Sequence, residues 1–87
     1  MKSHTTPRFR KLLARLTPEM RRQAHAAYQR FMQDPFHTGL NFELIDAKDD
    51  LWSARVNDYY RVLGYRDRDE ITWFWIGTHG EYDRLIG

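Results

Sequence analysis

The sequence contains no cysteine, so neither disulfide bonds nor thiolate metal sites can contribute to its fold or chemistry. It has no apolar run of the length that a membrane span needs, and its N-terminus lacks the apolar stretch of a signal peptide, which predicts a cytoplasmic protein. It also lacks a phosphate-binding glycine loop and a nucleophile elbow, and its histidines show no metal-ligand spacing. These absences argue against an ATPase, a metalloenzyme or an acyl-transfer enzyme, and no cofactor or metal is predicted.

The 87 residues are enough for a single domain, residues 1–87, with one modest core. The net charge of +2 conceals an asymmetry. Residues 1–33 carry eight Lys or Arg and one acidic residue, whereas residues 34–87 carry six basic and eleven acidic residues. A basic N-terminal region could attract nucleic acid or an acidic partner through salt-sensitive forces, and the alternative is an ordinary solvated helix surface.

Two helices are predicted in the basic N-terminal region. Thr6-Pro7 and Thr17-Pro18 each place a capping threonine before a proline, which is a typical helix start. Apolar residues at helical spacing follow both starts, and Asp34-Pro35 ends the second helix. The two helices should therefore be antiparallel and joined by a tight corner.

From Leu40 onward the apolar period changes to two, which indicates strands. The predicted strands are Leu40–Leu44, Trp52–Val56, Tyr60–Tyr65 and Ile71–Ile76, separated by a charged loop at 46–50 and by turns at Asn57-Asp58 and at 66–69. The last strand is apolar on both sides and should lie in the middle of the sheet or under helices. The sequence thus predicts an α+β fold, with two antiparallel helices packed on one face of a small antiparallel β-sheet whose other face is open.

The hairpin between the second and third predicted strands brings two arginines together. If residues 57–59 form its loop, Arg55 lies directly opposite Arg61, and like charges in that position destabilise a sheet. Such a pair is tolerated where an acid such as Asp58 or Glu43 neutralises it, or where it binds an anion. A phosphate fits the second case, since arginine binds phosphate through two hydrogen bonds. A two-residue loop would separate the pair, so the prediction depends on the register.

Several residues near the end of the chain could take part in chemistry. His79 follows the last strand in a glycine-flanked loop and could act as a general acid or base, or could be an ordinary surface histidine. Tyr82 could stack on a base or bind a phosphate, or could pack on the sheet edge. Glu43 and Glu81 are candidate carboxylate bases. Among the tryptophans, which are expected in the core, Trp75 is the one expected to be partly exposed.

These residues, in this order, resemble the RelE/ParE superfamily of bacterial type II toxins. The resemblance covers nearly the whole chain, and its most specific segments are Tyr60-Arg61-Val62-Leu63 and Trp75-Ile76-Gly77-Thr78-His79-Gly80-Glu81-Tyr82. The RelE-like and YoeB-like members resemble it most, and these are ribosome-dependent mRNA endoribonucleases that bind a cognate antitoxin. The resemblance therefore implies a cognate antitoxin, the ribosome and mRNA as partners.

The resemblance also implies roles for five residues. Arg61 matches the strand arginine that stabilises charge on the scissile phosphate, His79 is similar in place to the candidate general acid, and Tyr82 resembles the tyrosine that orients the nucleotide. Arg55 matches a basic, substrate-binding position. Glu43 lies within one residue of the glutamate base of YoeB-like members, but a one-residue offset on a strand points to the other face. The implied reaction is attack by the ribose 2′-OH on the adjacent phosphate, without a metal.

The sequence departs from the family pattern in three ways. The strand that contains Trp52 carries only one basic residue, Arg55, the chain stops at Gly87 without a C-terminal helix, and the usual first strand is compressed into Lys2–Thr5. With fewer basic residues than the family pattern, the protein could be a slower nuclease, could act on a different target, or could be an inactive relative. The ParE branch of the superfamily inhibits DNA gyrase and uses no nuclease site, so a gyrase inhibitor is the main alternative.

Overall fold

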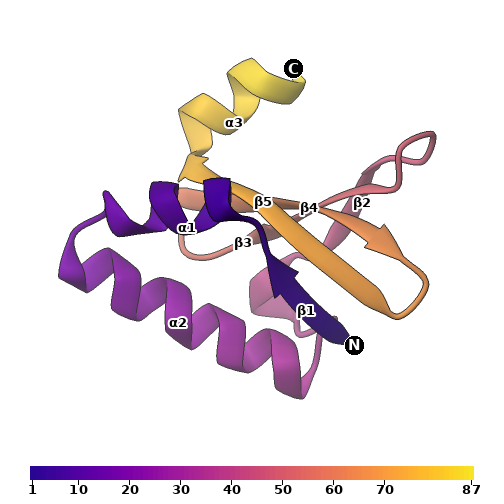
Figure 1. The fold of residues 1–87 in the computed structure, drawn as a ribbon, viewed down its shortest axis with the longest axis horizontal. Coiled ribbons are helices and arrows are strands. Elements are labelled where there is room, and N and C mark those ends of the chain that lie inside the picture. The colour runs from indigo at the N-terminus through magenta and orange to yellow at the C-terminus, as the bar shows by residue number, and fades with distance from the viewer.

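The computed structural model describes residues 1–87 as one five-stranded sheet with helices on both sides. The elements are β1 (Lys2–Thr5), α1 (Pro7–Ala14), α2 (Pro18–Gln33), a 3₁₀ turn η1 (Thr38–Leu40), β2 (Glu43–Asp46), β3 (Leu51–Arg55), β4 (Tyr60–Asp67), β5 (Glu70–Thr78) and α3 (His79–Ile86). The strand order is β1-β5-β4-β3-β2 (Figure 1). None of the three helices combines the length and the apolar character of a membrane-spanning segment.

The predicted α+β class is confirmed, but the sheet is mixed rather than wholly antiparallel. The pairs formed by β2, β3, β4 and β5 are antiparallel, as predicted. β1 instead runs parallel to β5, because the whole of the intervening chain separates the two strands and no hairpin joins them. β5 consequently has a neighbour on each side, which agrees with its uninterrupted apolar sequence.

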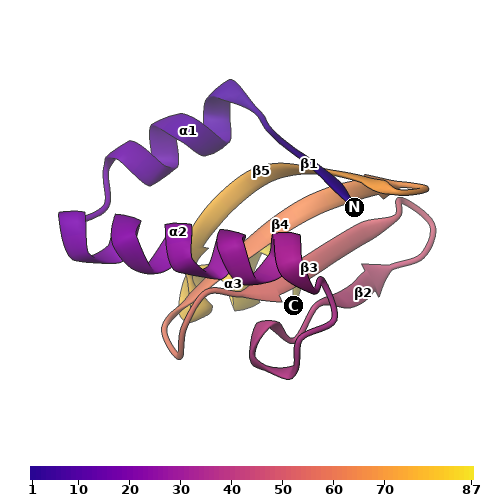
Figure 2. The same ribbon diagram turned by 90° about the horizontal axis from the view of Figure 1, so that it is seen from below.

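Both N-terminal helices begin where the threonine–proline pairs predict. The Thr6 hydroxyl accepts a hydrogen bond from the Phe9 amide at 3.1 Å, and the Thr17 hydroxyl accepts one from the Met20 amide at 3.2 Å. Each bond satisfies an amide that has no partner inside its helix. α2 ends at Asp34, also as predicted. The two helices run in roughly opposite directions across one face of the sheet (Figure 2).

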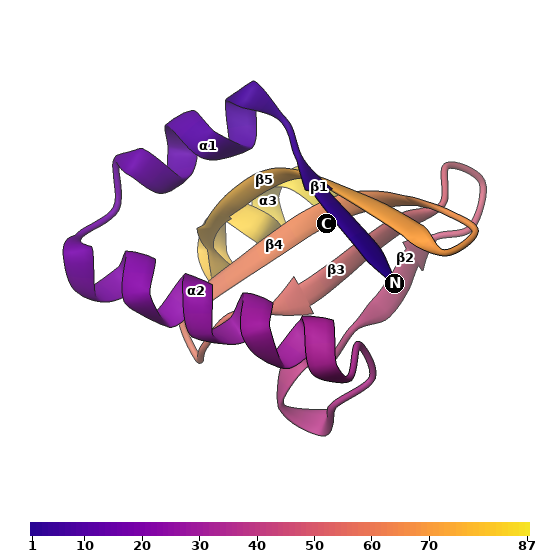
Figure 3. The same ribbon diagram turned by 60° about the horizontal axis from the view of Figure 1, so that its bottom comes forward.

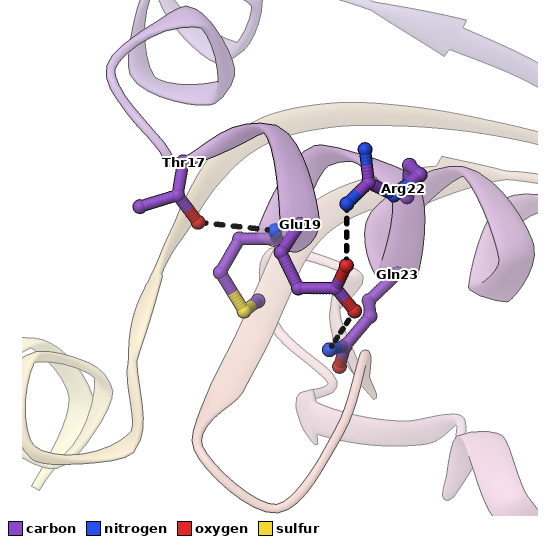
Figure 4. A network of polar contacts seen from close by, with 5 residues as sticks. Thr17, Glu19, Arg22 and Gln23 are labelled. Atoms are coloured by element: carbon purple, nitrogen blue, oxygen red, sulfur yellow. Dashed lines mark hydrogen bonds and ion pairs between the residues drawn. The ribbon is translucent and has the colours of Figure 1, made fainter.

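Glu19, the only acidic residue among residues 1–33, lies in the first turn of α2 and binds two side chains of the next turn (Figure 4). Glu19 accepts hydrogen bonds from Arg22 at 2.6 Å and from Gln23 at 3.2 Å. The bond from Arg22 is the main reason that the pKa of Glu19 lies below its ordinary value. No other lysine or arginine among residues 1–33 forms an ion pair, so the two helices present a basic surface.

The main core lies between these two helices and the sheet. Its buried members come from α1, α2, η1, strands β3 and β5, and the residues just before β2 and just after β3: Phe9, Ala27, Phe31, Leu40, Phe42, Ala54, Val56, Ile71, Trp73 and Ile76. The Trp73 indole also donates a hydrogen bond to the Ser3 hydroxyl at 3.0 Å, which ties β1 to its neighbour. This core accounts for the apolar stripes of both helices and of one face of each inner strand.

The opposite face of the sheet is partly covered, so the prediction of an open face is wrong. α3 lies on the side away from α1 and α2 (Figure 3). Its Tyr82 packs with Leu63 and Trp75 in a second, smaller core. Trp75 is only 6% exposed, contrary to prediction, and its ring folds over Gly77, where a Cβ atom would collide with it.

The strand predicted at Leu40–Leu44 is shorter and begins later. Leu40 belongs to η1, and the left-handed Asn41, with φ of 45°, ends that turn. β2 begins only at Glu43, and Leu44 is exposed. Leu40 and Phe42 are both buried although neither lies on a strand. Their alternation with polar residues comes from the 3₁₀ turn and the residues that follow it, and in the sequence it resembled a strand.

Candidate functional site

The β3–β4 hairpin has the register that brings the two arginines together. Arg55 pairs with Arg61, which confirms the three-residue loop at 57–59. The Asn57 side-chain oxygen holds this loop, since it accepts hydrogen bonds from the Tyr59 amide at 2.8 Å and from the Tyr60 amide at 2.9 Å. Because directly opposed residues share a face, both guanidinium groups start from the same face of the sheet.

The charge of this arginine pair is poorly neutralised. Arg55 Nη1 lies 3.9 Å from Asp58 Oδ1, and the Asp58 side chain is 85% exposed, so the ion pair contributes little. Arg61 forms no ion pair with any acidic residue. Of the two neutralising acids considered from the sequence, Asp58 approaches only Arg55, and Glu43 approaches neither arginine.

Arg61 itself is held between two side chains of α3. Its Nε donates a hydrogen bond to His79 Nδ1 at 3.0 Å, and its guanidinium carbon lies 5.2 Å from the centre of the Tyr82 ring. Its Nη1 atom is buried and has no hydrogen-bond partner. A buried donor without a partner costs about 1–3 kcal/mol, and the cost is larger for a charged group. An acceptor, and best an anion, would complete this environment.

His79 lies between a guanidinium group, that of Arg61, and a carboxylate, that of Asp83. A guanidinium group can only donate, so Nδ1 must be the unprotonated nitrogen and the ring proton lies on Nε2. Nε2 faces Asp83 Oδ2 at 3.3 Å, one helical turn later. The sequence reasoning did not single out Asp83. Its spacing of four residues from His79 was the available signal, but that spacing has meaning only on a helix.

The helix that carries these residues begins with a capping box. The Thr78 amide donates to Glu81 Oε1 at 2.8 Å, and the Glu81 amide donates to the Thr78 hydroxyl at 3.2 Å. The bond from the Thr78 amide is the main reason that the pKa of Glu81 is lowered. His79 is therefore the first residue of a helix, and the predictions of a loop there and of no C-terminal helix are wrong. Glu81, considered as a base, is occupied by the cap.

Tyr82 lies beneath the arginine. It is 6% exposed, and its hydroxyl donates to the fully buried Ser53 hydroxyl at 3.4 Å. Its ring lies 6.2 Å from the His79 ring at an angle of 26°. Of the two roles considered for Tyr82, packing on the sheet is the one that the structure displays, and through this packing it supports Arg61.

Glu43 lies on the same face as the arginines, although its one-residue offset predicted the other face. It pairs with Ser53, which in turn pairs with Leu63, and Ser53 and Leu63 lie two residues from Arg55 and Arg61 along their strands. Two strand spacings across and two residues along give a Cα separation of roughly 12 Å from Arg61. Glu43 is exposed and forms no hydrogen bond or ion pair with the other site residues.

The rest of the protein holds no candidate metal site, and its enclosed cavity is apolar. No three or more His, Cys, Asp or Glu side chains are grouped so that they could hold a metal ion. An apolar cavity of about 200 Å³ lies between the helix pair and the sheet, on the face away from the arginines, and Arg21, His25 and Tyr28 bring the only ionisable groups to its lining. The candidate site is therefore the face that carries Arg55, Arg61 and α3.

Comparison with known proteins agrees with this architecture. A family model of the ParE-like toxin domain matches residues 18–84. No curated protein matches the chain by sequence. The fold is similar to a chain of the RelB–RelE antitoxin–toxin complex from Methanococcus jannaschii, with 13% identity, coverage of 97% of this chain and 99% of that chain, and a TM-score of 0.72.

Two further solved structures share the fold. A chain of the archaeal RelE–RelB complex from Pyrococcus horikoshii OT3 is 18% identical over 91% of this chain and 94% of that chain, with a TM-score of 0.72. YafQ from E. coli strain BL21(DE3) is 13% identical over 99% of this chain and 98% of that chain, with a TM-score of 0.65. At these identities the likeness concerns the fold alone.

Proposed function

This chain belongs to the RelE/ParE superfamily of toxins, and from that starting point we propose that it is an endoribonuclease that cleaves mRNA on the ribosome without a metal. One observation carries the proposal. Arg61 is a cation with a buried donor that has no partner, and it lies opposite a second, weakly neutralised cation. A phosphodiester supplies the oxygen atoms that this arrangement lacks.

The proposed reaction is a transesterification within the RNA strand. The ribose 2′-oxygen forms a bond to the adjacent phosphorus, and the bond from phosphorus to the 5′-oxygen of the next nucleotide breaks. The products are a 2′,3′-cyclic phosphate and a free 5′-hydroxyl. A base removes the 2′-OH proton, an acid protonates the leaving 5′-oxygen, and a cation stabilises the charge that develops on the phosphate.

The site residues fit these roles as follows. Arg61 stabilises the developing charge, Arg55 binds a neighbouring phosphate, and Tyr82 fixes the orientation of Arg61 from below. His79 is the general acid and Glu43 is the candidate base. An exposed Glu43 about 12 Å from Arg61 leaves room for a nucleotide between two long side chains.

In this scheme the substrate frees His79 for proton transfer. Nδ1 now accepts the hydrogen bond from Arg61, so His79 cannot donate a proton from that nitrogen. When a phosphate takes over the guanidinium group, Nδ1 becomes free to take up a proton from solvent and to pass it on to the 5′-oxygen. The Asp83 carboxylate beside Nε2 then compensates the charge of the imidazolium.

A gyrase inhibitor is the competing proposal, because the matching family is described as ParE-like. In that case Arg61 would serve only the fold, pinning the sheet through Asp58 or Glu81. Glu81 is occupied by Thr78, and Asp58 lies near Arg55 instead. The contacts of Arg61 are instead with His79 and Tyr82. This grouping of a cation with a candidate general acid supports the nuclease over the gyrase inhibitor and over an inactive relative.

The proposed partners are the ribosome, mRNA and a cognate antitoxin, and a ribosomal target would place the protein in the cytoplasm. The antitoxin follows by analogy with the RelB–RelE complexes of the two archaea. Acidic residues of such an antitoxin would meet Arg55 and Arg61. Charge reversal at Arg61 is then expected to weaken complex formation.

The experiment is primer extension on a reporter mRNA in a purified translation system, with and without ribosomes. The wild-type protein should give ribosome-dependent cuts in frame with codons, and Arg61→Ala and His79→Ala should give none. Arg66→Ala is the matched control, since Arg66 lies on β4 but packs over Trp52 instead of facing α3. Unchanged cleavage in both site variants would remove the site assignment, and inhibition of supercoiling without any cuts would favour the gyrase inhibitor.

A further inference from the structure

Tyr59, at the tip of the β3–β4 hairpin, has no role in the site as described so far. Its side chain is 73% exposed, more than any other large hydrophobic or aromatic side chain of the protein. Tyr60, the next residue, packs against the main core. The hairpin therefore buries one tyrosine and leaves the other in solvent, where its ring gains nothing from packing within the protein.

The backbone of Tyr59 is nevertheless held firmly on three sides. Its amide donates to Asn57 Oδ1 at 2.8 Å, and its carbonyl accepts from the His79 amide at 2.7 Å. The Asn57 side-chain nitrogen donates in turn to Gln23 Oε1 of α2 at 2.6 Å. The loop is thus tied to β4, α2 and α3, so the backbone that carries the exposed ring is already ordered before a ligand binds.

This ordered backbone adjoins the candidate site. Tyr60 pairs with Thr78, so Tyr59 lies opposite His79, one step beyond the last pair of β4 and β5. Both residues lie just outside these strands, and the hydrogen bond from the His79 amide to the Tyr59 carbonyl at 2.7 Å holds their backbones side by side. Tyr59 also precedes Arg61 by two residues, or roughly 7 Å along the strand. The residue that carries this exposed ring therefore lies next to His79 and two residues from the arginine that would hold a phosphate.

We propose that Tyr59 is the stacking platform for a base that flanks the scissile phosphate, an inference that rests on the proposed endoribonuclease function. Single-stranded RNA offers unpaired bases, and proteins bind these by stacking them on exposed aromatic rings. Arg61 holds the phosphate and Tyr59 holds the neighbouring base, so the two together set which phosphodiester lies against His79. Tyr59 contributes to binding and positioning, and it takes no part in proton transfer.

The test measures single-turnover cleavage of mRNA on programmed ribosomes at increasing concentrations of the toxin. Tyr59→Ala should raise the half-saturating concentration about ten-fold, the typical effect of losing one stacked base, while the rate at saturation stays the same. Tyr59→Phe should behave as the wild type, because stacking needs the ring and not the hydroxyl. Tyr65→Ala is the matched control, since Tyr65 is also exposed but lies at the far end of the β3–β4 ladder, opposite Leu51.

A second arm identifies the base. Nucleotides around the cut are replaced one at a time by abasic nucleotides. At one position the wild type should lose the same factor as Tyr59→Ala does, and Tyr59→Ala should lose nothing further there. An active wild type with an indistinguishable Tyr59→Ala, or with equal abasic losses in both proteins, overturns the stacking role alone. A wild type that cuts no RNA overturns the proposed function together with it.

Discussion

Arg61→Met should remove activity and yet leave the protein at least as stable as the wild type. Methionine keeps an unbranched chain of similar length over the Tyr82 ring but lacks the charge and all the donors. The substitution therefore separates two properties of Arg61, namely what it contributes to the folded state and what it offers to a substrate. Most substitutions at partly buried positions are destabilising, so the expected sign is unusual.

The magnitude follows from the contacts of Arg61. Removal of the buried Nη1 donor relieves about 1–3 kcal/mol, and removal of the charge opposite Arg55 relieves up to about 1 kcal/mol. Against this, the hydrogen bond to His79 is lost, at about 0.5–1.5 kcal/mol, as is the cation–π contact with Tyr82, at about 0.5–1 kcal/mol. The balance is a stabilisation of about 1 kcal/mol, equivalent to a rise in Tm of roughly 4–8 °C for a domain of this size.

The assay combines chemical denaturation with the cleavage assay. Cleavage by Arg61→Met should fall by about 100-fold or more, the usual effect of removing one group that stabilises transition-state charge. Arg66→Met is the control: Arg66 packs over Trp52 at 4.8 Å and its Nε donates to the Arg68 carbonyl at 2.9 Å, so its removal should destabilise the fold and spare cleavage. If Arg61→Met lowers the free energy of unfolding by more than about 1 kcal/mol, Arg61 is a structural residue and the reasoning is refuted.

Two further predictions concern the start of α3. Gly77→Ala should lower the free energy of unfolding by about 1–3 kcal/mol, because the added methyl group collides with the Trp75 ring and presses on Glu81. Chemical denaturation measures the loss of stability, and the chemical shift of the His79 amide reports the disturbance of the helix start. The lowered pKa of Glu81 makes the capping box depend on pH: its stabilisation is complete above the ordinary glutamate pKa of about 4.3 and is lost as the pH falls through the lower pKa of the folded state. Circular dichroism between pH 5 and 2 should show loss of this helix, Glu81→Gln should weaken that dependence, and a helical signal in the wild type that stays constant throughout would contradict the assignment.

The parts of the fold that were predictable are those in which local chemistry is decisive. A threonine hydroxyl caps a free amide of the first helical turn and the proline after it fits the first helical position, so both helix starts were placed correctly. The Arg55–Arg61 pair was predictable only as one of two alternatives, because Asn57 and Asp58 indicate a turn but do not fix its length, and the structure has the three-residue loop that opposes the two arginines. The parallel pairing of β1 was not predictable. Its four residues, Lys2–Thr5, are exposed or half-buried and carry no pattern that distinguishes parallel from antiparallel pairing.

α3 was missed for a physical reason that also explains the wrong environment of His79. An isolated helix of eight residues has little stability of its own, and a glycine at its second position lowers its propensity further. Its stability comes from the capping box of Thr78 and Glu81 and from the burial of Tyr82 against the second core. The spacing of threonine and glutamate was visible in the sequence, but the apolar surface that receives Tyr82 exists only after the sheet has formed.

The unfavourable charges and the buried donor without a partner fall on one face of this sheet. The face covered by α1 and α2 holds an apolar cavity, but its aromatic rings pack edge to face around Phe31 and no buried donor there is left without a partner. The face with α3 carries opposed arginines, a buried guanidinium donor without a partner, and at its edge the most exposed aromatic ring of the protein. The first two features lower the stability of the isolated protein and the third adds nothing to it, and an RNA strand would satisfy all three, because its phosphates accept from arginine and its bases stack on tyrosine. A purely structural explanation needs a separate reason for each, whereas binding of a single-stranded polyanion provides one.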